Sequence, residues 1–218
     1  MTVWTGWLDL LSSALGLLAT QAGLGAGLAV VALTLALRAL VLPITFPNAC
    51  RGLVRQRKLA ALQPELARLK ERYAGEPQKY GEALLAAYNR HGISMVDGRT
   101  LLGAFVQTPV LLGMFTTLRR ALPHGRFLWV ADLAKPDVLL AIVAGLTTAI
   151  LALAAPEMPE HVRVLMMILP AICLALTALH FGSAIALYWT TSNLFTAGQT
   201  LAVRWFVARR PAAGAQSA

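Results

Sequence analysis

The chain has 218 residues, of which 57% are hydrophobic and 13% are charged, and its formal net charge is +9. A soluble domain of this length is rarely so apolar, because its surface has to meet water, so the composition argues against a soluble globular protein. The apolar residues gather in blocks of about 20, the length at which a helix crosses about 30 Å of hydrocarbon. The sequence therefore predicts an all-α membrane protein.

Residues 1–22 precede the first long apolar block and predict an amphipathic helix. One helical face carries two tryptophans and four leucines: Trp4, Trp7, Leu8, Leu11, Leu15 and Leu18. We expect this helix to lie in the outer membrane interface with its tryptophans at headgroup depth. The alternative for residues 4–18 is an extra, short span.

Five apolar blocks follow, at about 25–47, 101–120, 137–155, 164–180 and 184–206. A lone strand would leave its backbone polar groups unsatisfied in lipid, so each block predicts a membrane-spanning helix. Residues 23–47 are expected to form the first membrane helix, and residues 99–206 are expected to hold membrane helices two to five.

Basic residues are concentrated between the first two spans. Segment 48–99 holds ten Lys or Arg side chains, whereas the first 37 residues hold none. The positive-inside rule then places the N-terminus outside, and both segment 48–98 and the short tail 207–218 in the cytoplasm. Five spans give this orientation. The loop at 119–135 is the weakest fit, because its basic residues would lie outside.

Segment 48–98 predicts a basic helical hairpin. Its first arm repeats apolar residues at steps of three and four, and its second arm, about 78–90, has a matching stripe. The two stripes comprise Leu59, Leu62, Leu66, Leu69 and Tyr73, and Tyr80, Leu84 and Tyr88. A basic projection of this kind suits acidic headgroups, ribosomal RNA or an acidic partner. The candidate docking residues are Arg55, Arg57, Lys58, Arg68, Lys70 and Arg72. A merely solvated loop is the alternative.

Arg38 is the most informative single residue, because it is the only charge in the apolar run from about Gly25 to Phe46. Arginine at the centre of a membrane helix costs about 2.5–3.5 kcal/mol, and such a residue usually faces the bundle interior or a watery cavity. Snorkelling to the interface is the alternative, but the end of the run is about 13 Å away along a helix. We therefore favour a polar cavity within the membrane.

Other predicted spans supply polar and aromatic side chains that could line such a cavity with Arg38. Thr34 lies one helical turn before Arg38, on the same face. The remaining candidates are Gln107, Thr108, Tyr188, Trp189, Ser192, Asn193 and Gln199. For Ser192 and Asn193 the alternative is ordinary hydrogen bonding between helices, which does not exclude lining a cavity.

Motifs for catalysis and for metal binding are missing from the sequence. The two cysteines and four histidines have no metal-ligand spacing, and no phosphate-binding loop or nucleophile motif occurs. We expect no catalytic residue, no metal and no cofactor.

In order and spacing, the residues resemble those of the YidC membrane protein insertases, which have mitochondrial and chloroplast relatives. The resemblance covers nearly the whole chain after about residue 20. It rests on Thr34-x-x-x-Arg38 with Leu42-Pro43, Leu62-Gln63-Pro64-Glu65, Pro77-Gln78, Ala87-Tyr88, Gln107-x-Pro109, Phe127-x-Trp129 with Asp132-Leu133, and Leu187-Tyr188-Trp189-x-x-Ser192-Asn193 with Gln199.

The resemblance implies a five-span core that inserts hydrophobic segments of client proteins into the bilayer of the bacterial cytoplasmic (inner) membrane, alone or beside the Sec translocon. It implies a hydrophilic groove in which Arg38 attracts a client's acidic tail, with Thr34, Tyr188 and Trp189 at similar groove positions. The basic hairpin would recruit ribosomes or signal-recognition machinery, with no role for DNA.

One stretch departs from the family pattern. Many bacterial members carry Asn-Pro-Leu-Gly-Gly-Cys before the second span, whereas residues 96–101 here read Val-Asp-Gly-Arg-Thr-Leu. Two other functions remain open from the residues: an anion transporter or channel that uses Arg38 as its binding charge, and a passive membrane assembly scaffold.

Overall fold

The computed structural model describes residues 2–93, 98–121, 123–153 and 180–209, together with 164, 168–169, 172 and 176. Within these residues every regular element is a helix, and the only strand-like pairing is an isolated bridge between Phe127 and Val130. The all-α prediction is thus confirmed for the described residues. Most of the predicted span 164–180, residues 96 and 97 of the divergent stretch, and the tail from residue 210 lie outside them.

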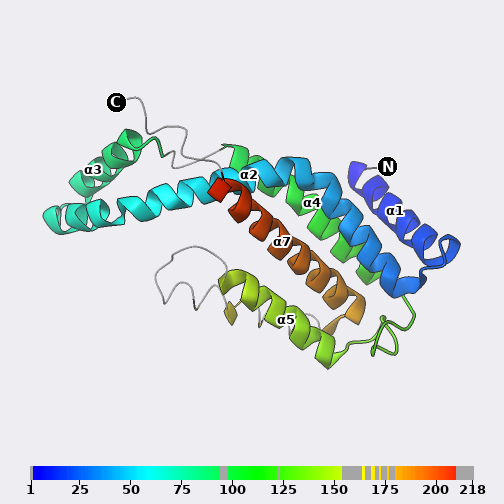
Figure 1. Cartoon of the computed structure of the whole chain (residues 1–218). Coiled ribbons are helices and arrows are strands. Elements are labelled where there is room, and N and C mark those ends of the chain that lie inside the picture. Colours follow the sequence, from blue (N-terminus) through cyan, green and yellow to red (C-terminus); the bar gives the residue numbers. More distant parts are fainter. Residues whose placement is uncertain are drawn as a thin grey trace. The chain divides into compact units, whose positions relative to one another are not determined.

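The helices are, in chain order, α1 (Val3–Gly16), a π-helical turn η1 (Leu17–Gln21), α2 (Gly25–Arg72), α3 (Pro77–Arg90), α4 (Gly98–Ala121), α5 (Val138–Leu153) and α7 (Ser183–Arg209) (Figure 1). Of the described helices, α2 alone is both long and apolar enough to cross a bilayer, and α5 is a shorter apolar helix. α4 and α7 have 24 and 27 residues, which is long enough to span about 30 Å.

The helix that contains the first predicted span does not end near residue 47. α2 continues for 48 residues, through Pro43, Pro47 and Pro64. Proline removes one helix hydrogen bond and bends a helix, but the helix continues where the turns on both sides are held. The expected first span and first hairpin arm are therefore parts of one helix.

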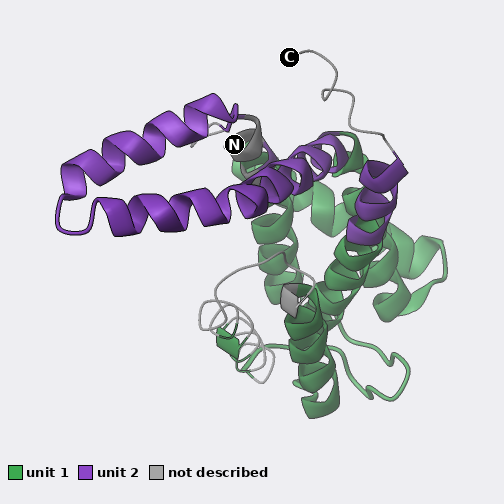
Figure 2. Cartoon of the chain, turned by 60° about the vertical axis from the view of Figure 1, so that its left-hand side comes forward, with its two compact units in different colours: residues 1–43, 105–199 green, residues 44–104, 200–218 purple. Residues whose placement is uncertain are grey.

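The chain divides into two compact units (Figure 2). The first unit comprises residues 1–43 and 105–199, and the second comprises residues 44–104 and 200–218. The boundary within α2 directly follows Pro43, where the proline ring weakens the helix ladder. α1, the start of α2, most of α4, α5 and most of α7 belong to the first unit.

The first unit has one apolar core to which α1, α2, α4, α5 and α7 all contribute. Leu11, Val30, Met114, Ala144 and Ile185 are all fully buried members of it. The leucine face of α1 thus packs on the protein, with Leu11 and Leu15 both in this core. Whether α1 lies in the outer interface or crosses the membrane stays a prediction.

In the second unit, the far part of α2 and α3 bury the two predicted stripes. Of the predicted stripe residues, Leu62 is buried and the others are half-buried; Ala87 of α3, which was not in the predicted stripe, is also buried. The Glu65 carboxylate lies 3.0 Å from Arg90 Nη2 and 3.2 Å from His91 Nε2, which links the two helices. The helix predicted at about 78–90 is present as α3, and Gly75 lies in the turn before it with a positive φ of 91°.

Candidate functional site

Arg38 binds to side chains from two other helices of the first unit. Its Nε donates a hydrogen bond to Ser192 Oγ of α7 at 2.9 Å, and its Nη2 donates to the same oxygen. With the Gln107 side-chain amide of α4 oriented to place its oxygen toward the guanidinium, that oxygen accepts from Nη1 at 2.5 Å and from Nη2 at 3.1 Å. We call these three residues, Arg38, Gln107 and Ser192, the Arg38 cluster.

In the Arg38 cluster, the hydrogen-bond acceptors of the charged guanidinium are both neutral. Ser192 is buried, and Arg38 and Gln107 are half-buried. In the described part of the chain, no carboxylate forms an ion pair with Arg38. A hydroxyl and an amide satisfy N–H donors but leave the positive charge uncompensated. In surroundings of low dielectric constant, such a charge attracts an anion more strongly than it would in water.

Thr34 and the aromatic pair lie close to the cluster but in different roles. Thr34 is buried, and its hydroxyl donates to the Val30 carbonyl of its own helix at 2.6 Å. Tyr188 is 2% exposed, and its hydroxyl is buried without a hydrogen bond among the described residues. Trp189 is half-buried, with its ring centroid 6.4 Å from that of Tyr188. Tyr188 is therefore the buried ring of the pair, and Trp189 is the more accessible one.

Asn193 faces another helix rather than Arg38. Its Nδ2 donates to Thr148 Oγ1 at 2.8 Å and to Thr147 Oγ1 at 3.4 Å, both on α5. The alternative considered for Asn193, a hydrogen bond between helices, is thus what the structure contains. Of the other polar candidates, Gln199 is half-buried and Thr108 is exposed.

The candidate docking residues lie on the α2 part of the second unit. Arg57, Lys58, Arg68, Lys70 and Arg72 are exposed, and Arg55 is half-buried. The Arg72 guanidinium lies 5.8 Å from the centroid of its neighbour Tyr73. These side chains make an accessible basic surface on the same helix as the buried Leu62.

Known proteins are similar in sequence to this chain over most of its length. The family described as "60Kd inner membrane protein" matches residues 17–210. The chain belongs to this family. Membrane protein insertase MisCA of Bacillus subtilis is 30% identical over 189 residues, which are 82% of this chain and 70% of that protein. Membrane protein insertase YidC 1 of Halalkalibacterium halodurans is 33% identical over 183 residues, 80% of this chain and 68% of that protein.

A third relative is much longer than this chain. Membrane protein insertase YidC of Polynucleobacter asymbioticus is 28% identical over 174 residues, which are 77% of this chain but only 30% of that protein. The resemblance to the YidC insertases is therefore confirmed. The chain is a membrane protein insertase of this family, a role that the family carries out without catalysis.

Sequence reasoning missed the contact that fixes α1 in this insertase. Trp7 Nε1 donates to the Pro109 carbonyl of α4 at 3.1 Å. A Cβ atom on Gly113, one turn further along α4, would lie 2.4 Å from the same nitrogen. Trp7 therefore contacts the middle of α4 rather than its end. The two residues are 106 positions apart, so no local sequence pattern predicts this contact.

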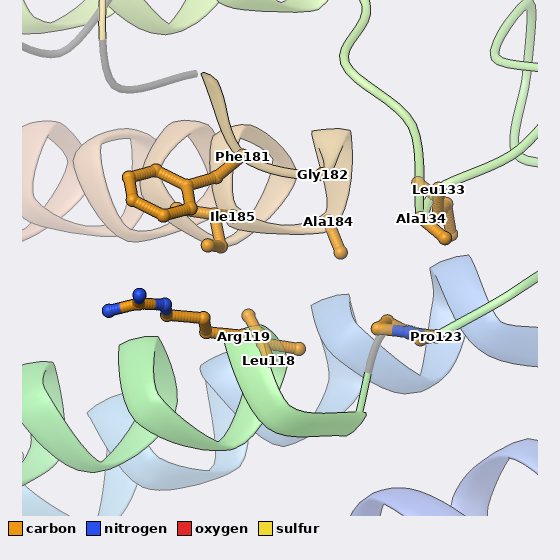
Figure 3. A pocket seen from close by; sticks show the side chains of 9 residues that line it. All are labelled: Leu118, Arg119, Pro123, Leu133, Ala134, Phe181, Gly182, Ala184 and Ile185. Carbon is orange, nitrogen blue, oxygen red and sulfur yellow. The ribbon is translucent and has the colours of Figure 1, made fainter. Parts of the chain in front are cut away.

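A small cavity lies away from the Arg38 cluster, where the loop before α5 meets the start of α7. Figure 3 shows the Arg119 side chain extended opposite the Phe181 ring, with Leu133, Ala134 and Pro123 at the other end of the cavity. The Arg119 guanidinium carbon lies 5.3 Å from the Phe181 centroid. At about 20 Å³ the cavity has room for about one water molecule, so it is a packing gap rather than a binding site.

Proposed function

We propose that the Arg38 cluster is the part of this insertase that receives the polar, acidic flank of a client segment. The observation that supports this role is the arginine charge held by neutral acceptors from two other helices. A carboxylate that meets Arg38 would form a charge-assisted hydrogen bond and recover part of its own desolvation cost. The cluster would then form one wall of a hydrophilic groove, with Thr34, Tyr188 and Trp189 beside it.

The driving force of the proposed reaction is hydrophobic. A wet groove shortens the low-dielectric path that a client's polar tail has to cross. Once the tail has passed, transfer of the client's apolar helix into lipid is favourable without nucleotide hydrolysis. No bond is made or broken, so we propose no catalytic residue.

We further propose a multi-pass topology with five spans in the bacterial cytoplasmic membrane. The N-terminus would lie outside, and the second unit's helical pair and the C-terminus would lie in the cytoplasm. The length of α2 supports this: 48 residues rise about 72 Å, more than twice the hydrocarbon thickness, so part of the helix lies beyond it. The basic residues between 48 and 99 support the cytoplasmic side for that part.

The exposed basic surface of α2 is proposed to dock the ribosome, targeting factors or the Sec translocon. Its charge and accessibility support an acidic or nucleic-acid partner. Reversing Arg68, Lys70 and Arg72 to Glu should slow insertion of ribosome-bound clients while leaving post-translational insertion unchanged. An equal rate for ribosome-bound clients in the variant and the wild type would contradict the docking role.

The experiment that tests the Arg38 role uses purified protein in liposomes. A single-span client with an acidic N-terminal tail is added, and protease protection of the tail is followed with wild type, Arg38→Lys and Arg38→Ala. We expect insertion with wild type and Lys, and strong slowing with Ala. A client with a neutral tail is the control and should be slowed least. Equal slowing of both clients would indicate a folding defect, and small-anion flux without insertion would favour a transporter.

A further inference from the structure

The loop between α4 and α5 contains a tight turn at residues 127–130. Its two central residues are large and apolar, although its backbone conformation favours a small or polar residue. Phe127 and Val130 exchange two backbone hydrogen bonds, of 2.9 and 2.8 Å, which close a two-residue turn. A two-residue turn with a positive φ at its first central residue favours Gly at that position, because Gly has no Cβ atom. Here the central pair is Leu128-Trp129, and Leu128 has a φ of 52°. Of the described residues, it is the only non-glycine with a positive φ.

The two outer residues of the turn pack on the protein, and the two central residues face the surface. Val130 is buried, and Phe127 packs so closely on α2 that a Cβ atom on Gly27 would lie 2.3 Å from its ring. Leu128 and Trp129 are instead 72% and 50% exposed. The strained backbone therefore presents two large apolar side chains outward, at the position where a polar turn residue would fit without strain.

The base of the loop is held rigidly, so the tip has a fixed direction. Leu133 is fully buried, and its carbonyl accepts a hydrogen bond from the Ala184 N–H at 3.1 Å. The Lys135 carbonyl accepts from Ser183 N–H at 2.9 Å. The Ala134 N–H donates to the Asp132 carboxylate and, with the nearby His124 ring, holds the pKa of that carboxyl below its usual range.

The tip lies at the start of an apolar helix. Trp129 Nε1 donates to Asp137 Oδ1 at 3.3 Å, and the same oxygen accepts the Leu140 N–H at 2.7 Å at the first turn of α5. Exposed apolar residues of α5, Val138, Leu139 and Ile142, follow directly. In a membrane protein, the end of an apolar helix marks the boundary between hydrocarbon and headgroups, where tryptophan is favoured. The loop 119–137 also carries four basic side chains against two carboxylates.

We propose that the Leu128-Trp129 tip is a lipid anchor that inserts at the headgroup boundary of the leaflet facing the start of α5. The apolar pair would enter the acyl boundary while the basic side chains of the loop, among them exposed Arg126, meet lipid phosphates. This use accounts for basic residues in a loop that the positive-inside rule disfavours outside. The proposed topology decides only which leaflet the anchor enters; the anchoring itself does not depend on it.

A fluorescent probe at position 128 tests the anchor. Leu128→Cys is labelled with NBD, in a Cys50→Ser, Cys173→Ser background, and the protein is placed in nanodiscs of phosphatidylcholine and phosphatidylglycerol. Ala61→Cys, an exposed position on α2 in the second unit, is the matched control. We expect blue-shifted emission at position 128 and loss of emission when the acyl chains are brominated, with neither effect at position 61.

Two outcomes would overturn the proposal. One is water-like emission at position 128 that iodide quenches as strongly as at position 61. The other is blue-shifted emission that brominated lipids do not quench, because a second copy or another protein would then cover the tip. Dithionite added outside sealed vesicles reports the side separately: a lipid-buried probe on the opposite leaflet keeps the anchor and refutes the topology.

The strain at Leu128 provides a second test. Asparagine tolerates the left-handed backbone, so Leu128→Asn keeps the turn and removes the apolar group. With the probe moved to Trp129→Cys, we expect Leu128→Asn to shift its emission toward that in water. Leu128→Met, which keeps the apolar character, should leave the emission unchanged. An equal emission in both variants would refute an anchoring role for Leu128.

Discussion

The two units use arginine in opposite ways. In the first unit Arg38 is half-buried, and its partners Ser192 and Gln107 are neutral. In the second unit Arg90 is exposed and pairs with the Glu65 carboxylate. A charge costs most where water is scarce, whereas an exposed ion pair contributes about 0–1 kcal/mol. The uncompensated charge thus lies where it is most costly, which supports the proposed role of Arg38 in receiving a client's acidic tail.

The largest difference in stability between the two units should come from changes at closely packed glycines. In Gly113→Ala the new Cβ would lie 2.4 Å from Trp7 Nε1, so α1 has to shift. We expect a loss of about 1–3 kcal/mol, measured by denaturant unfolding in detergent. The control is Gly81→Ala in α3, where nothing lies within 4 Å of the new Cβ. It should be neutral or gain up to about 1 kcal/mol from helix propensity. Equal effects at both glycines would refute the packing of Trp7 on Gly113.

The next largest effect should come from the Arg38 cluster. Ser192→Ala removes the acceptor of two guanidinium hydrogen bonds, which predicts a loss of about 1–3 kcal/mol in the same unfolding assay. Thr190→Val on the same helix is the matched control, because the Thr190 hydroxyl is buried without a hydrogen bond among the described residues. That change should be neutral or stabilising. A loss no larger than that of the control would mean that water replaces Ser192 at Arg38.

Asn193 should matter less than the Arg38 cluster. Asn193→Ala breaks the hydrogen bonds to Thr147 and Thr148, and such contacts between membrane helices contribute about 0.6 kcal/mol on average and at most about 1.7. Combining Asn193→Ala with Thr148→Val in a double-mutant cycle isolates the contact energy. Strict additivity of the two changes would contradict the link between α5 and α7.

The smallest effect is expected in the second unit. Glu65→Gln removes the charge that pairs with Arg90 and His91, all of them partly or largely exposed. We expect a loss below about 1 kcal/mol that shrinks further in high salt, because water and ions already screen these charges. A loss as large as that of Ser192→Ala would remove the contrast between the units.

Much of the architecture could be predicted from the sequence. The apolar blocks predicted α4, α5 and α7, and the stripes of segment 48–98 predicted α3 and the buried Leu62, because helix periodicity depends on neighbours three and four residues away. The continuity of the helix past residue 47 was not predicted, since prolines bend a helix without ending it where the adjacent turns are held. The lone charge at Arg38 was visible for the same local reason, and so was the family.

Tertiary structure alone decided which side chains meet. Ser192 and Asn193 are adjacent in sequence, yet one binds Arg38 and the other binds α5. Neighbouring residues of a helix point about 100° apart, so packing against two different helices separates them. Trp7 on Gly113 and Leu128 in its strained turn likewise depend on partners outside their own segments. The sequence determined the helices and the unusual charge, whereas helix packing decided which partners hold that charge.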